Sequence, residues 1–107
     1  MQRKIIDMHT HIFPEKIAAK AVKATGDYYG IPMSRSGTAE DLLSDGARAG
    51  VGRYLVCSTA TKPEQVAAVN GFIREACDMH PEFFGFGTLH PDLPGFEKEI
   101  ERILSLG

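Results

Sequence analysis

The sequence lacks three features, and each absence excludes a class of protein. No apolar run approaches the roughly 18 residues of a membrane-spanning helix, and the first four residues lead into no signal-peptide core. The formal net charge of −2 offers no basic surface for nucleic acid or for an anionic membrane. The two cysteines, Cys57 and Cys77, form no paired framework. We therefore predict a reduced, cytoplasmic protein that binds neither nucleic acid nor membranes.

The sequence does contain enough apolar material for one packed domain. It has 107 residues, of which 43% are hydrophobic, and no low-complexity tract. A chain of this length holds at most one domain of ordinary size. We therefore treat residues 1–107 as a single unit.

Short apolar segments alternate with segments of helical periodicity. Strands are predicted at residues 4–9, 53–58 and 83–89, and the second is apolar on both faces, as in a strand buried between layers. Helices are predicted from Pro14 to Gly26, from Thr38 to Gly50, from Thr61 through Cys77, and from Phe96 to Gly107. Residues 26–38 are expected to form a glycine-rich loop, and two capping boxes pair Thr38 with Asp41 and Thr61 with Glu64. This alternation predicts an α/β fold of parallel β-α units.

The stretch Asp-Met-His-Thr-His at positions 7–11 follows the apolar pair Ile5-Ile6 directly. Residues two apart on a strand share a face, with Cα atoms roughly 6.6 Å apart. His9 and His11 can therefore converge on one transition metal at Zn–N distances of about 2.0–2.1 Å. The alternative is a pair of histidines that hydrogen-bond in a loop without a metal. We predict that His9 and His11 are metal ligands.

Three stretches carry a resemblance to a known family: Ile5–Glu15 (IIDMHTHIFPE), Ala49–Val56 (AGVGRYLV) and Phe83–Pro91 (FFGFGTLHP). In this order they resemble the N-terminal portion of the amidohydrolase superfamily, in its amidohydrolase-related (amidohydrolase 2) branch. That branch contains metal-dependent hydrolases and decarboxylases of the aminocarboxymuconate type.

The resemblance implies a (β/α)8 TIM-type barrel, of which this chain would be the first three strands, with a fourth strand expected after Gly107. It also implies an active site at the C-terminal ends of the strands. By residue-to-residue match, His9 and His11 take the two metal-ligand positions of the first strand, with zinc as the expected metal. The other ligands and the catalytic base come from the family's fifth, sixth and eighth strands. The resemblance therefore implies no catalytic residue within this chain and no activity for the chain alone.

The reaction implied for the parent protein is hydrolysis of a C–N or C–O bond at a carbonyl of a small-molecule substrate, by zinc-activated water. A non-oxidative decarboxylase of the same family is the alternative. Phosphoesterases of the histidinol-phosphatase type also begin with Asp-x-His-x-His, but the Ile-Phe-Pro-Glu that follows at positions 12–15 is unlike theirs. A hypothesis of another class is a non-catalytic, self-associating α/β module. Three parallel strands leave two open edges, so we expect a homo-oligomer.

Two further polar residues have either a functional or a structural interpretation. Asp7 is predicted to share the face of His9 and His11. It either orients a metal-ligating histidine without binding the metal itself, or is a partly buried structural carboxylate. His90, predicted at the end of the third strand, faces substrate, supports a ligand, or caps the strand end.

Other candidates are expected to be structural. His80 precedes Pro81 at a predicted helix end, where an imidazolium is favoured. Cys57 and Cys77 have no neighbouring histidine at metal spacing in the sequence and are interpreted as small core residues. Tyr28 and Tyr29 are placed in the glycine-rich loop, either lining a pocket mouth or packing on the surface.

Overall fold

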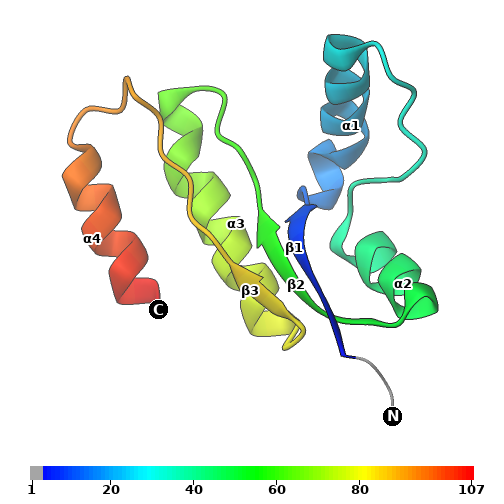
Figure 1. Ribbon diagram of the computed structural model, residues 1–107. Helices are drawn as coiled ribbons and strands as arrows, with labels where there is room; N and C mark the ends of the chain where they lie inside the picture. Colours follow the sequence, from blue (N-terminus) through cyan, green and yellow to red (C-terminus); the bar gives the residue numbers. More distant parts are fainter. Residues whose placement is uncertain (1–3) are drawn as a thin grey trace.

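The computed structural model describes residues 4–107 and confirms the α/β class (Figure 1). Three parallel strands form one sheet in the order β1-β2-β3, with β2 in the centre. The strands are β1 (Ile5–His11), β2 (Val51–Cys57) and β3 (Phe83–Gly85). The helices are α1 (Glu15–Tyr29), α2 (Ala39–Ala49), α3 (Val66–Met79) and α4 (Phe96–Leu106), with a 3-10 turn η1 (Pro63–Gln65) before α3. No helix among residues 4–107 is both long and apolar enough to cross a membrane.

The end of α1 corrects the predicted helix boundary. The helix continues past Gly26 to Tyr29, and Gly30 ends it in the left-handed conformation (φ 65°). Gly26 is buried inside the helix, where a Cβ atom would lie 2.8 Å from the carbonyl oxygen of Ile31. The glycine is therefore a close-approach site, and the helix stop falls on Gly30. Tyr28 and Tyr29 consequently lie in the last turn of α1 and not in the loop, and both are exposed.

The strand boundaries also differ from the prediction. Strand β1 extends to His11, and β3 stops at Gly85 although residues 83–89 were predicted to be extended. Beyond Phe86, whose N–H still donates to the Val56 carbonyl, the backbone turns to a side chain of α3. Asn70 accepts from the Thr88 N–H and donates to the Thr88 carbonyl, as a neighbouring strand would. A buried amide therefore takes the place of sheet pairing in this segment.

The first predicted capping box forms only in part. The Thr38 hydroxyl accepts from the backbone N–H of Asp41 at 3.3 Å and caps α2 as expected, but the Asp41 carboxylate accepts from Ser36 and not from the Thr38 N–H. At the start of η1, Gln65 and not Glu64 reaches back, and its Oε1 accepts from the backbone N–H of Thr61 at 2.9 Å. The prediction for Glu64 was wrong because a 3-10 turn precedes α3 and shifts the cap by one residue.

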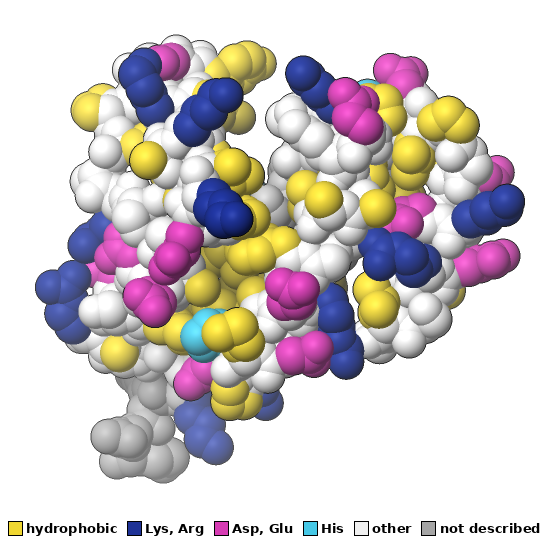
Figure 2. All heavy atoms as spheres, turned by 180° about the vertical axis from the view of Figure 1, so that it is seen from behind, with side chains coloured by type: hydrophobic (Ala, Val, Ile, Leu, Met, Phe, Trp, Pro, Cys, Tyr) yellow, Lys and Arg dark blue, Asp and Glu magenta, His cyan; other side chains and the backbone are white. Residues whose placement is uncertain are grey.

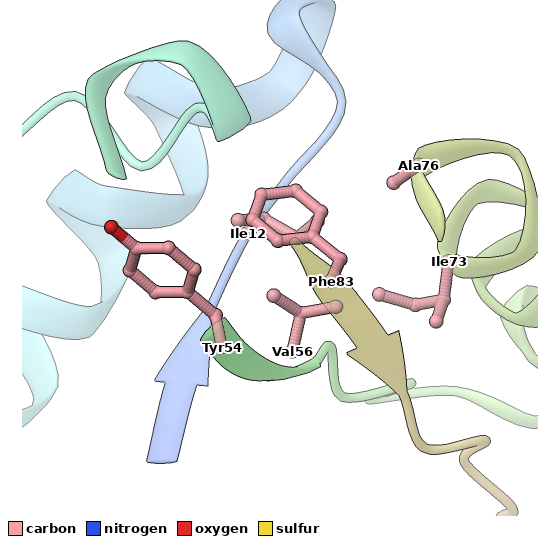
Figure 3. Packing of buried hydrophobic residues seen from close by; sticks show 6 residues of the cluster. All are labelled: Ile12, Tyr54, Val56, Ile73, Ala76 and Phe83. Atoms are coloured by element: carbon pink, nitrogen blue, oxygen red, sulfur yellow. The ribbon is translucent and has the colours of Figure 1, made fainter. Parts of the chain in front are cut away.

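The core lies between the sheet and the helices (Figure 3). Its buried members are Ile12, Tyr54, Val56, Ile73, Ala76 and Phe83. Tyr54 and Phe83 meet edge to face, with ring centroids 5.7 Å apart. Three consecutive residues of β2, Tyr54 to Val56, are buried, as expected for the central strand of the sheet.

The edge strands are less protected than the centre. Strand β1 exposes Ile6 and Met8, and the chain just after β3 exposes Phe86 and Leu89. Seen from the helix side, apolar side chains also gather in a hollow between the α1–α2 part and the α3–α4 part (Figure 2). The chain therefore presents two open strand edges together with exposed apolar side chains.

Candidate metal centre

The two histidines of β1 lie side by side on the exposed surface of the strand. His9 Nε2 and His11 Nε2 are 3.1 Å apart, and the two rings meet edge to face with centroids separated by 5.0 Å. Both side chains are exposed. The predicted convergence of the two imidazoles is therefore present in the structure.

The separation of the two nitrogens is a test of whether the pair fits a metal. Two ligand nitrogens at tetrahedral angles around zinc, each about 2.05 Å from it, are about 3.3 Å apart. The 3.1 Å between His9 Nε2 and His11 Nε2 differs from this by only a few tenths of an ångström. The separation is compatible with a chelated divalent metal, and it is also the length of a hydrogen bond between the two rings. No group of three or more potential ligands occurs among residues 4–107.

Thr10 explains why both imidazoles point away from the core. Its side chain is only 6% exposed, and its hydroxyl donates to the carbonyl of Leu55 in β2 at 2.6 Å. Neighbouring residues of a strand point to opposite faces, so anchoring Thr10 on one face directs His9 and His11 to the other. The orientation of the pair therefore depends on one buried hydroxyl between them.

Asp7 lies elsewhere than its spacing predicts. The β1–β2 register is irregular between Asp7 and Thr10, so that Asp7 pairs with Tyr54 while His11 pairs with Cys57. Tyr54 and Cys57 are three residues apart on β2 and face opposite ways, and the predicted shared face of Asp7 and His11 is therefore wrong. Burial, and then the nearby Asp7 charge, raise the pKa of Tyr54, which agrees with this position. The Asp7 carboxylate accepts from the backbone N–H of His9 and supports the strand at that point.

His90 lies in the loop between β3 and α4, five residues beyond the end of β3. Its Nδ1 accepts from the backbone N–H of Asp92 at 3.1 Å, a local turn contact. Among the described residues, no hydrogen bond joins His90 to His9 or His11. Within residues 4–107, His90 also forms no group of three potential ligands with the histidine pair.

The structure adds Cys57 to the site. In the β1–β2 register Cys57 pairs with His11, and its Sγ lies 3.5 Å from His11 Nδ1. The interpretation of Cys57 as a core residue without a histidine neighbour was therefore wrong. Burial raises the pKa of the Cys57 thiol above 9.0. The signal was available: His11 and Cys57 end adjacent parallel strands, and strand ends meet at one edge of a sheet.

The other two candidates occupy structural positions. His80 caps the C-terminus of α3, its N–H bonds to the Ala76 carbonyl, and its ring lies 5.1 Å from that of Phe83. Cys77 is a half-buried residue of α3, and burial raises the pKa of its thiol. Within residues 4–107, no hydrogen bond joins His80 or Cys77 to His9 or His11.

Comparison with known proteins gives no match: no family model, no curated protein and no solved structure is similar enough to the chain to be assigned to it. The interpretation of the site therefore depends on its own geometry and on the resemblance of its motifs.

Proposed function

We propose that this chain is the N-terminal part of a metal-dependent hydrolase of the amidohydrolase type, and that His9 and His11 are two of its metal ligands. The observation that carries the proposal is the 3.1 Å separation of their Nε2 atoms on the exposed face of β1. Their position at the C-terminal end of a parallel strand supports it, because that end of the strands holds the active site in β/α barrels.

The proposed architecture is the first three units of a (β/α)8 barrel. It is supported by three parallel strands in sequential order, with a helix after each strand. Three strands leave a sheet with two edges, whereas a barrel closes on itself. The two free cysteines are compatible with the proposed cytoplasmic setting.

The proposed role of this chain is chelation and not turnover. A catalytic zinc usually has three protein ligands, and it lowers the pKa of its bound water to about 7. Residues 4–107 bring only His9 and His11 together as a matched pair of nitrogens. We therefore expect weak binding of zinc and no hydrolase or decarboxylase turnover by the chain alone.

Isothermal titration calorimetry with zinc tests the proposal. The His9→Ala/His11→Ala variant is expected to lose the binding heat of the wild-type chain, because both chelating nitrogens are gone. A matched control, His80→Ala/His90→Ala, removes two histidines outside the pair and is expected to bind like wild type. Equal titrations of wild type and His9→Ala/His11→Ala would remove the metal-site assignment.

We further propose that the chain forms a homo-oligomer through its sheet edges. The support is the unpaired outer edges of β1 and β3, together with the exposed side chains of Met8 and Phe86. Sedimentation equilibrium at micromolar concentration should give a mass above the 11.7 kDa of one chain. The Met8→Lys/Phe86→Lys variant should shift the population toward monomer. A clean wild-type monomer with cooperative unfolding contradicts both the association and the barrel-fragment architecture.

A further inference from the structure

Four groups at the end of β1 and β2 form a continuous chain of polar contacts. His9 Nε2 lies 3.1 Å from His11 Nε2, and His11 Nδ1 lies 3.5 Å from the sulfur of Cys57. The same sulfur lies 3.5 Å from the backbone carbonyl oxygen of Thr10. Both ring nitrogens of His11 are thus engaged, one by a histidine and the other by a cysteine.

The direction of each hydrogen bond follows from the one group that cannot donate. A carbonyl oxygen only accepts, so the Cys57 S–H must donate to the Thr10 carbonyl. The sulfur is then left as an acceptor, which assigns the proton of this contact to His11 Nδ1. A neutral imidazole has one N–H, so His11 Nε2 holds a free lone pair and accepts from the N–H of His9 Nε2.

We propose that Cys57 is a positioning residue of the metal centre, which holds His11 in the Nδ1–H tautomer and directs the Nε2 lone pair toward the metal. This inference rests on the proposed function, because it assigns a partner to a proposed ligand. Histidine ligands generally donate their second ring N–H to a fixed acceptor, which sets the tautomer and the ring orientation. Here the acceptor comes from the adjacent strand and is a sulfur atom.

The two histidines then have different roles. His11 is already in the ligand tautomer before the metal binds, because its Nδ1–H is engaged by Cys57. In the metal-free chain His9 donates a hydrogen bond from Nε2. Its proton must therefore move to Nδ1 before Nε2 can bind a metal. Metal binding should therefore change the tautomer of His9 and leave that of His11 unchanged.

Nitrogen-15 NMR of the imidazole rings in the metal-free chain tests this directly. The wild type should show His11 in the Nδ1–H form and His9 in the Nε2–H form. In Cys57→Val, which keeps a side chain of similar size without an acceptor, His11 should become a mixture of tautomers, and Cys57→Ser should restore the Nδ1–H form. Cys77→Val, at the other free cysteine, should leave both histidines unchanged. Wild-type His11 in the Nε2–H form, or an unchanged tautomer in Cys57→Val, overturns the proposal.

Metal binding supplies the second readout. The zinc dissociation constant should rise about tenfold in Cys57→Val, which is the low end of the effect of losing such a partner, and recover in Cys57→Ser. With cobalt(II) in place of zinc, the wild type should show no thiolate-to-cobalt charge-transfer band. Such a band would make Cys57 a ligand and would contradict the positioning role. Absence of any zinc binding by wild type contradicts the proposed function, while the metal-free spectra still decide the role of Cys57.

Discussion

Two polar clusters in this small chain use similar side chains in opposite ways. The framework cluster consists of Asn70, Glu99 and Arg102, where α3 meets α4. Asn70 is 4% exposed and the Glu99 side chain 11%, and each polar atom of the Asn70 amide has a partner. The histidine cluster, His9, His11 and Cys57, lies at the end of two strands, and both of its imidazoles are exposed.

The difference shows how to separate structural from functional polar groups. In the framework cluster Asn70 connects α3 to Thr88 and to Glu99 of α4, and Arg102 of α4 donates to the Ala67 carbonyl of α3. In the histidine cluster the Nε2 atoms of the two imidazoles contact each other, and both side chains are exposed, so a metal can reach them. A buried and fully satisfied network holds a fold together, whereas an exposed and convergent one is available to a ligand.

The largest expected effect on stability belongs to the framework cluster. Asn70→Ala removes three hydrogen bonds, two with the backbone of Thr88 and one with Glu99, and at about 1 kcal/mol each it should cost about 3 kcal/mol. Urea unfolding measures the loss, with Lys98→Ala on the exposed face of α4 as the control, expected within about 0.5 kcal/mol of wild type. Zinc affinity should not change. A folded Asn70→Ala variant that loses zinc binding would show that the two clusters are coupled.

A pair of glycine substitutions sharpens the contrast between covered and open surfaces. A Cβ atom at Gly46 in α2 would overlap the Tyr54 hydroxyl, so Gly46→Ala should destabilise the fold by about 2 kcal/mol through overpacking. A Cβ atom at Gly71 in α3 meets nothing within 4 Å, and Gly71→Ala should stabilise the fold by about 0.8 kcal/mol through helix propensity. Thermal unfolding of both variants measures the two opposite signs. Equal effects would mean that α2 does not pack on Tyr54 as described.

The smallest expected effect is a dependence on pH. Hydrogen bonds from Arg102 hold the pKa of Glu99 below 4.5; partial burial opposes this shift, and the Asn70 amide contributes to it. A carboxyl whose pKa is lower in the folded state adds stability above its unfolded pKa, and this stability is lost as the pH falls through the folded pKa. Stability should therefore decline as the pH falls below about 4.5, and Glu99→Gln should show a shallower decline over that range. Parallel curves for the two proteins would contradict the role given to Glu99.

Much of the fold was predictable because its signals are local. Alternation of β-branched segments and amphipathic helices indicated parallel β-α units, and Thr38 with Asp41 marked the start of α2. The misplaced boundaries depend on contacts distant in sequence. Gly26 is typical of a helix stop in sequence, but its place depends on the close approach of Ile31, and the segment after β3 pairs with a side chain of α3.

The histidine pair could be predicted because its spacing is a property of one strand. The place of Asp7 could not, because it depends on an irregularity in the pairing of β1 with β2 that has no sequence marker. The contact of Cys57 with His11 needs two strand ends in register, 46 residues apart. Partners contributed by a second strand are therefore the part of the site that reasoning along one segment misses.

The metal centre is tested most directly by which histidines respond to zinc. The chain has four, and NMR of the imidazole protons during a zinc titration reports on each separately. We predict that the signals of His9 and His11 shift together and saturate at one zinc per chain, while those of His80 and His90 stay in place. Shifts of equal size at all four histidines, or no shift at His9 and His11, would contradict the assignment of the metal centre.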